Sequence, residues 1–201
     1  MEIWMRAVPC RLLRAGEDLG RWVVDNLTAA APAPEDGDVL VVAHKVVSLA
    51  EGRVVCLSEV TPSEAARRLA SEVGKDPSLV ELVLRESVEV VRKRPGLLVA
   101  RHRLGFVCAN AGLDQSNAGP DVAVLLPENP DASARRIREA LRGSFGRAVG
   151  VVVADELASA ATLLMGQADE GRPLVLIRGW PAGGEGSAQT LVRPPEGDLF
   201  R

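Results

Sequence analysis

The sequence predicts a mixed α/β fold of the α+β kind, in a single domain spanning residues 1–201. Apolar runs rich in β-branched residues alternate along the whole chain with segments of helical periodicity. Nearly half of the residues are apolar and a quarter are charged, which is the composition of a soluble domain with a buried core. Because tyrosine is absent and other aromatic residues are scarce, valine, leucine and alanine must build that core.

The first two elements are predicted from their apolar patterns. Residues 16–27 place Leu19, Trp22 and Leu27 on one stripe, which predicts an amphipathic helix. Residues 38–50 (DVLVVAHKVVSLA) form a continuous β-branched run, and we expect a buried strand there.

The sequence next predicts two helices whose N-terminal caps can be recognised from residue type. The first covers 61–74, where Thr61 is the expected N-cap and Gly74 the expected stop. The second covers 76–96 and begins at Asp76, ahead of a proline suited to the first turn.

The second half of the chain is predicted to contain a strand pair, a helix and two further strands. The pair is formed by 97–112 and 121–128, and a small polar cluster lies in their connection. The other elements are expected in this order: a helix over 130–143 capped by Asp131, a buried strand running into a helix over 147–166, and a last strand over 172–180.

Charge and cysteine usage exclude several classes of protein. A formal charge of −3 gives no reason to expect a nucleic-acid partner. No apolar run has the length of a membrane span, and the N-terminus lacks the apolar core of a signal peptide. The three cysteines, Cys10, Cys56 and Cys108, are too far apart in sequence for a zinc knuckle or a redox dithiol. We therefore expect a reduced, cytoplasmic protein without a membrane partner.

Three stretches carry candidate chemistry. Residues 110–117 (NAGLDQSN) favour an ordinary turn, although a carboxylate and an amide at a strand end also suit a hard cation. His44 and Lys45 interrupt an apolar strand, where their side chains are expected on opposite faces. They are equally well explained by burial and snorkelling or by binding of an anion. The glycine-rich loop 166–171 favours a helix end followed by a solvated loop.

Taken together, the segments resemble a known family. The motifs NAGLDQSN (110–117), AEGR (50–53) and ADELA (154–158) occur in the order found in the F420-0 gamma-glutamyl ligases, which extend the deazaflavin coenzyme F420. The resemblance covers nearly the whole chain. It implies a mixed α/β homodimer that uses GTP and Mn²⁺ or Mg²⁺ to join L-glutamate to the deazaflavin precursor through an amide bond.

The resemblance also implies roles for individual residues. Asp114 and Gln167 match metal-binding positions, and no catalytic residue is assigned. The positions that match nucleotide contacts are Cys10, Arg11, Leu12, Leu13, His44, Lys45, Asn117, Met165, Gly166, Ala168, Asp169, Glu170, Gly171 and Arg172.

The chain departs from the family pattern at two places. Leu49 occupies a position where the family has a lysine. A family segment that includes a metal-binding aspartate is missing near 143–155, whether the gap is aligned at Gly143 or after Val153. Asp155 either replaces the lost ligand or, as residue type favours, caps the following helix. Three hypotheses remain: a minimal ligase, a degenerate relative that binds nucleotide or deazaflavin or serves as a partner subunit, and a ligase for another carboxylate acceptor.

Overall fold

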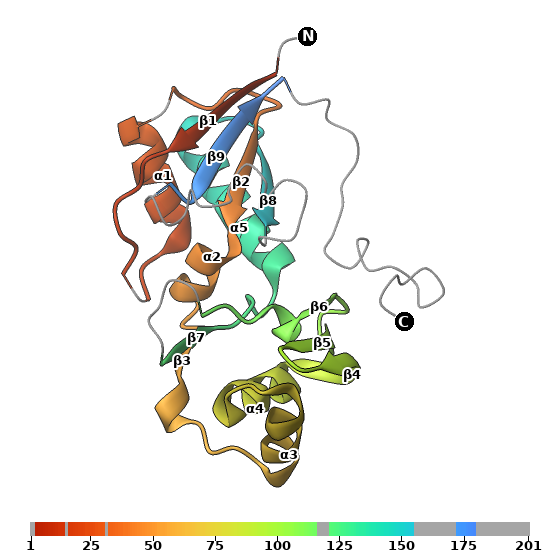
Figure 1. The fold of residues 1–201 in the computed structure, drawn as a ribbon. Helices are drawn as coiled ribbons and strands as arrows, with labels where there is room; N and C mark the ends of the chain where they lie inside the picture. Colours follow the sequence, from red (N-terminus) through yellow and green to blue (C-terminus); the bar gives the residue numbers. More distant parts are fainter. Residues whose placement is uncertain (1–2, 15, 31, 116–120, 155–171, 180–201) are drawn as a thin grey trace. The chain divides into compact units, whose positions relative to one another are not determined.

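The computed structural model describes residues 3–14, 16–30, 32–115, 121–154 and 172–179. Helices and strands alternate along them, which confirms the mixed α+β class. The chain divides into two compact units (Figure 1). Of the described residues, those up to 53 and those from 126 to 179 belong to unit 1, and those from 54 to 125 belong to unit 2. That the two units act as one domain stays a prediction.

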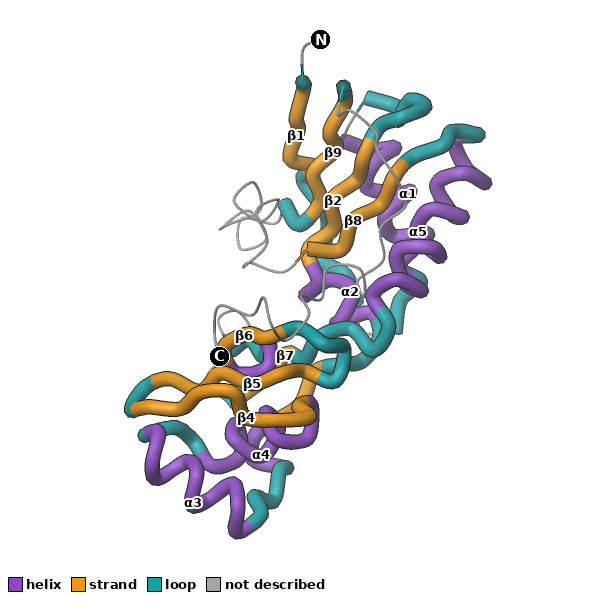
Figure 2. The backbone as a smooth tube through the Cα atoms, turned by 90° about the vertical axis from the view of Figure 1, so that its right-hand side faces the viewer, coloured by secondary structure: helices purple, strands orange, loops and turns teal. Residues whose placement is uncertain are grey.

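Unit 1 is built on a four-stranded mixed sheet. Its strands are β1 (Trp4–Val8), β9 (Leu174–Arg178), β2 (Val39–Ala43) and β8 (Gly150–Ala154), in that spatial order. Strands β1 and β2 run antiparallel to β9, whereas β8 runs parallel to β2 (Figure 2). Consequently β1, β2 and β8 all end at the edge of the sheet where β9 begins.

Helices α1 (Leu19–Ala30) and α5 (Pro130–Phe145) pack together on one face of this sheet (Figure 2). A Cβ atom added at Gly20 would lie 2.8 Å from the Cβ of Ala140, so the close helix contact requires glycine there. The stripe predicted for α1 is confirmed at Trp22 and Leu27, which are fully buried. The predicted cap Asp131 is wrong: Asn129 accepts the cap bond from the N–H of Ala132 at 2.9 Å.

The strand predicted over 38–50 is only half right. Strand β2 ends at Ala43, and helix α2 (His44–Ala50) follows without a loop. A buried apolar run has the same composition in a strand and in a short helix, so its pattern did not reveal the change.

Unit 2 has its own apolar core. Helices α3 (Glu64–Val73) and α4 (Pro77–Glu86) pack against a three-stranded sheet in the order β4-β5-β6. These strands are β4 (Ser87–Arg94), β5 (Leu97–His102) and β6 (Val107–Ala109). The remaining elements are β3 (Val54–Cys56), which pairs with β7 (Val122–Val124), and the 3₁₀ turns Leu57–Glu59 and Asn110–Gly112.

Three predictions in unit 2 are wrong. Residues 76–96 are not one helix, because α4 ends at Glu86 and the valine-rich remainder pairs with β5. The cap of α3 is Ser63, which accepts the N–H of Ala66, and not Thr61. The segments 97–112 and 121–128 do not form one pair: the first contains the β5–β6 hairpin, and the second supplies β7 to β3.

Other signals in unit 2 are confirmed. Asp76 caps α4 by accepting the backbone N–H groups of Ser78 and Leu79 at 2.8 and 3.0 Å. Gly74 ends α3 in the left-handed conformation that favours glycine. Within the described ranges of both units, no helix is long and apolar enough to cross a membrane.

Candidate functional site

The strand-end edge of the unit 1 sheet is where β1, β2 and β8 end and β9 begins. Val8 of β1 and Val42 of β2 both pair with Leu174, at the start of β9. On the other side of β2, Ala43 pairs with Ala154, the last residue of β8. Ligands of open α/β sheets bind beyond the carboxyl ends of strands, so this edge is the expected place for a site.

The predicted nucleotide-binding residues that the structure describes in unit 1 adjoin this edge. Residues 10–13 follow β1, and His44 and Lys45 follow β2 directly. Arg172 is separated from the start of β9 by Pro173 alone. Segments separated by more than a hundred residues in sequence are thus brought to one edge by strand pairing alone.

One backbone hydrogen bond extends the strand pairing into the site. The N–H of Ala43 donates to the carbonyl of Pro173 at 3.0 Å, one step beyond the pair Val42–Leu174. His44, the first residue of α2, and Arg172 come next along the two segments. Two predicted contacts thus follow directly on one backbone hydrogen bond at the end of the sheet.

The loop of residues 10–13 is held to α1 by two hydrogen bonds at Arg11. Its N–H donates to the side-chain oxygen of Asn26 at 2.9 Å, and its carbonyl accepts the indole N–H of Trp22 at 3.2 Å. Leu13 packs against the apolar core, whereas Leu12 is 90% exposed. The backbone of the loop is thus held at Arg11, and the side chains of Arg11 and Leu12 are both exposed.

Charges beside the loop are paired with each other. The guanidinium of Arg11 forms a two-point contact with the Glu17 carboxylate, which also accepts the N–H of Arg14 at 3.1 Å. These bonds lower the pKa of Glu17 to about 2 and raise the pKa of Arg11. Burial raises the pKa of the Cys10 thiol to about 12, so this cysteine is protonated at neutral pH.

His44 and Lys45 occupy the first turn of α2, which corrects the expectation that they point to opposite faces of a strand. His44 is 3% exposed, and Lys45 is half-buried. Because successive helical residues are about 100° apart, the two side chains lie on neighbouring sides of the helix.

Glu51 fixes the other end of α2, and its importance could not be read from residue type. Its carboxylate accepts the N–H of Glu128 at 3.0 Å and the hydroxyl of Ser133, and it pairs with Arg136 at 3.3 Å. These bonds tie α2 to the start of α5. The only signal was that Glu51 lies in the AEGR motif, which the structure shows to be a joint between helices.

Asp114, the predicted metal ligand, belongs to unit 2 and is pinned by its backbone. Its N–H donates to the carbonyl of Val124 at 3.0 Å, and its carbonyl accepts the N–H of Val124 at 2.8 Å. Just before it, Asn110 and Ala111 have φ angles of 49° and 54°, a left-handed region that costs non-glycine residues free energy. Strain of this kind persists where the surroundings over-determine the backbone, as at functional sites.

Several predicted site residues lie outside the described residues, so the structure assigns them no geometry. They are Asn117, Asp155, Met165, Gly166, Gln167, Ala168, Asp169, Glu170 and Gly171. Carboxylate and amide oxygens, as in Asp114 and Gln167, are the donors that Mg²⁺ and Mn²⁺ prefer. In the part of the chain that the structure describes, no group of three or more His, Cys, Asp or Glu side chains suits a metal ion.

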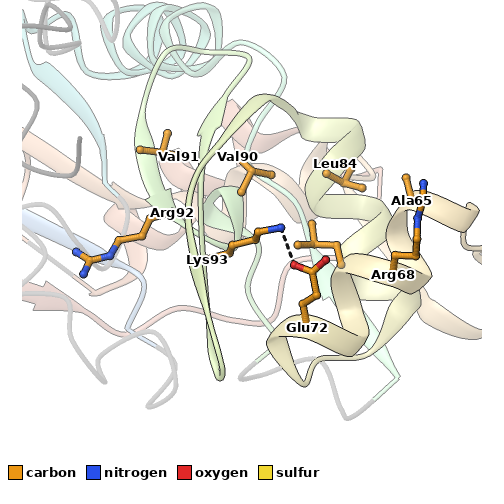
Figure 3. A pocket seen from close by; sticks show the side chains of 9 residues that line it. Ala65, Arg68, Glu72, Leu84, Val90, Val91, Arg92 and Lys93 are labelled. Atoms are coloured by element: carbon orange, nitrogen blue, oxygen red, sulfur yellow. Dashed lines mark ion pairs between the residues drawn. The ribbon is translucent and has the colours of Figure 1, made fainter.

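An open pocket of about 620 Å³ lies in unit 2 between α3, α4 and β4 (Figure 3). Lys93 on β4 reaches across it to Glu72 on α3, with 2.6 Å between ammonium nitrogen and carboxylate oxygen (Figure 3). Its lining is otherwise mostly aliphatic and includes no predicted site residue. The strand-end edge, where predicted site residues from three separate segments meet, is therefore the better candidate site.

The fold is that of a mixed α+β protein, and the loops at the strand ends of unit 1 form its candidate site. The model of the F420-0:Gamma-glutamyl ligase family matches residues 7–155 and 152–179, and the chain belongs to this family.

Three curated relatives support this assignment, each named coenzyme F420:L-glutamate ligase. The protein of Methanothermobacter thermautotrophicus is 39% identical over 94% of this chain and 95% of its own length. That of Methanopyrus kandleri is 38% identical over 95% of this chain and 94% of its own length. That of Methanocaldococcus jannaschii is 33% identical over 94% and 93%.

The comparisons also locate a difference between this chain and its relatives. The alignment with the first relative spans 239 residues, more than the 201 of this chain, so the relative has residues without a counterpart here. The two parts of the family match meet at residues 152–155. Gly143, the other place considered for the gap, lies within α5 and not at a strand end.

Proposed function

We propose that this protein is a GTP- and metal-dependent ligase that adds L-glutamate through an amide bond to the deazaflavin precursor of coenzyme F420. The observation that carries the proposal is the convergence of residues 10–13, His44, Lys45 and Arg172 on one edge of the sheet. The names of the curated relatives support the substrates. The family resemblance supports a homodimer, and three free cysteines fit a reducing cytoplasm.

In the proposed reaction, the terminal carboxylate of the acceptor attacks the γ-phosphorus of GTP, which yields an acyl phosphate and GDP. The amine of L-glutamate then attacks the acyl carbon, the amide bond forms, and phosphate leaves. Residues 10–13 and His44 would contact the nucleotide, and Lys45 would offset phosphate charge. Asp114 and Gln167 would hold Mn²⁺ or Mg²⁺, which neutralises charge on the phosphates.

Two departures from the family shape the proposal. Leu49 on α2 replaces a lysine, which removes one positive charge. The segment absent near 143–155 takes with it an aspartate that binds metal in the family. Asp155, which follows β8 directly in sequence, has two alternative roles: substitute for that aspartate, or cap of the following helix, which its residue type favours. Loss of metal-dependent turnover in Asp155→Asn would assign it the first role, and unchanged turnover the second. Leu49→Lys should tighten GTP binding.

A second candidate function is a degenerate family member that binds nucleotide or deazaflavin, or acts as a partner subunit, without ligation. The loss of the lysine and of the second aspartate favours it, because phosphoryl transfer depends on positioned charge. Ligation by the isolated protein would exclude this alternative.

The test is a ligation assay read by mass spectrometry. Purified protein is incubated with GTP, Mn²⁺, L-glutamate and the acceptor that lacks glutamate, and the relative from Methanothermobacter thermautotrophicus serves as positive control. The proposal predicts a product heavier by one glutamyl unit, GTP consumption, and loss of both in Asp114→Asn. If the control forms product and this protein forms none, the degenerate alternative is supported. A GTP-binding measurement would then show whether the protein binds the nucleotide without ligation or has lost that binding as well.

A further inference from the structure

We propose that Asn26 is a positioning residue for the nucleotide, because it fixes the peptide of Arg11 at the centre of the loop 10–13. This inference rests on the proposed function. Asn26 itself lies on α1, is 5% exposed, and matches no predicted site position.

The geometry around Asn26 is a closed arrangement of hydrogen bonds. Its side-chain oxygen accepts the N–H of Arg11 at 2.9 Å, and its side-chain nitrogen donates to the carbonyl of Trp22 at 2.7 Å. The indole of Trp22 returns a bond to the carbonyl of Arg11 at 3.2 Å. Both polar backbone groups of Arg11 are thus held by one turn of α1.

Burial prevents these hydrogen bonds from being replaced by bonds to water. Trp22 is 1% exposed, so neither side chain can exchange its bonds for water at low cost. The amide of Asn26 is also the only part of this arrangement that both donates and accepts through a side chain. A side chain at this position without an acceptor would leave the buried N–H of Arg11 unsatisfied, and one without a donor would lose the bond to the carbonyl of Trp22.

The arrangement determines what the loop presents. With Arg11 fixed at its peptide and Leu13 packed in the core, the backbone between them has little freedom, and Leu12 is held outward. A loop fixed before the ligand arrives loses less conformational entropy on binding. Asn26 would therefore raise nucleotide affinity without touching the nucleotide.

The experiment compares three variants by GTP affinity, from titration calorimetry, and by melting temperature. Asn26→Ala removes both side-chain bonds, and we expect GTP to bind about 10-fold more weakly. Asn26→Asp keeps an acceptor for Arg11 but places a carboxylate against the carbonyl of Trp22. We expect it to lower the melting temperature more than alanine does, yet to bind GTP within about 3-fold of the wild type.

Val23→Ala is the matched control, because Val23 is fully buried on the same helix as Asn26 and belongs to the same apolar cluster as Trp22. It should lower the melting temperature while leaving GTP affinity unchanged. A purely structural role for Asn26 predicts instead that affinity follows melting temperature across all three variants. That result, or equal affinity in Asn26→Ala and Val23→Ala, would overturn the inference.

A second readout needs no nucleotide. The Cys10 thiol precedes Arg11 and contacts the carbonyl of Val8 at 3.2 Å, so its alkylation rate reports loop opening. Peptide mapping should show faster Cys10 alkylation in Asn26→Ala than in Val23→Ala, and an equal rate would contradict the arrangement. If the wild type binds no GTP, the proposed function fails and the role in nucleotide binding fails with it. If the wild type binds GTP but the Asn26 variants match Val23→Ala in GTP affinity and in Cys10 alkylation, the inference fails and the proposed function stands.

Discussion

The two units of this protein hold their candidate site residues by different means. In unit 1, residues 10–13, His44 and Arg172 extend from the ends of paired strands, and buried side chains such as Asn26 bind their backbone. In unit 2, Asp114 follows a turn with left-handed backbone angles and is pinned by one pair of backbone hydrogen bonds. The position of the loop 10–13 in unit 1 thus comes from hydrogen bonds to α1, whereas the position of Asp114 in unit 2 is accompanied by backbone strain.

Because of this difference, some substitutions should change ligand affinity without a large change in the free energy of unfolding. A polar group that fixes a loop can be removed at moderate cost to the fold, so its effect on a ligand is measurable. A strained residue responds in the opposite way, because relief of strain offsets what the substitution removes.

The largest effect concerns the largest apolar cluster of each unit, and these two clusters share no residue. Leu176→Ala in unit 1 and Leu98→Ala in unit 2 should each cost about 2–5 kcal/mol, since both side chains are fully buried. Trp4 and Trp22 belong to unit 1, and residues 54–125 of unit 2 contain no tryptophan, so in a Trp180→Phe background tryptophan fluorescence reports on unit 1 alone. In urea titrations Leu176→Ala should shift the fluorescence midpoint. Leu98→Ala should shift mainly the circular dichroism midpoint, and equal shifts in both signals would mean that the units unfold as one.

Next in size is the ion pair at the opposite edge of the unit 1 sheet. Asp38 is 1% exposed and accepts bonds from Arg178 at 3.0 and 2.9 Å, and from the N–H of Glu35. Asp38→Ala should cost about 2–3 kcal/mol, less than a fully buried pair because Arg178 keeps contact with water. Denaturant unfolding measures this cost.

Two controls accompany the Asp38 variant. Glu35→Ala removes the exposed partner of Arg178 and should cost no more than about 0.5 kcal/mol. GTP affinity should be unchanged in both variants, because they lie at the far ends of the strands. Weaker GTP binding in Asp38→Ala at a temperature where it is fully folded would place the site elsewhere.

A smaller effect tests strain in unit 2. Ala66 lies in α3 and Ala111 in the left-handed turn, and both are fully buried. Ala66→Gly should cost about 1.5–2 kcal/mol, from helix propensity and the lost methyl group. Ala111→Gly should lie within about 0.5 kcal/mol of the wild type, because glycine removes a penalty of about 1 kcal/mol. Equal costs in urea titrations would show that the turn is not strained.

The smallest effect is the pH dependence of the Arg11–Glu17 pair. The pKa of Glu17 is lowered to about 2 by hydrogen bonds from Arg11 and from the N–H of Arg14. The pair therefore contributes fully above the unfolded pKa of about 4.5 and is lost as pH falls toward 2. An NMR titration of the Glu17 carboxyl should give a midpoint near 2 at low salt. A midpoint near 4.5 would show that the pair does not hold the loop.

Much of the fold followed from local signals in the sequence. Gly74 and Asp76 were read correctly because a helix end needs a left-handed residue and a helix start needs an acceptor. Residues 87–94 were misread as helix because the spacing of their valines also fits a helical stripe. Only the hydrogen bonds to β5, which no local pattern reveals, decide for a strand.

The candidate site was less predictable than the fold. Asp114, His44 and Lys45 were singled out by residue type and by resemblance, but their environments were not. His44 was expected in a strand, but β2 ends at Ala43 and His44 is the first residue of α2. Asn26 carried no sequence signal, since its role arises only when α1 packs beside the end of β1.

The central claim, that the strand-end edge of unit 1 binds GTP, is tested most directly by hydrogen–deuterium exchange with and without GTP and Mn²⁺. GTP bound at this edge should slow amide exchange in residues 10–13, 43–46 and 172–173. Exchange at the opposite edge, in residues 38–39 and 177–178, should not change. Slower exchange at the opposite edge, or no change in residues 10–13 and 43–46 when GTP is bound, would contradict this claim.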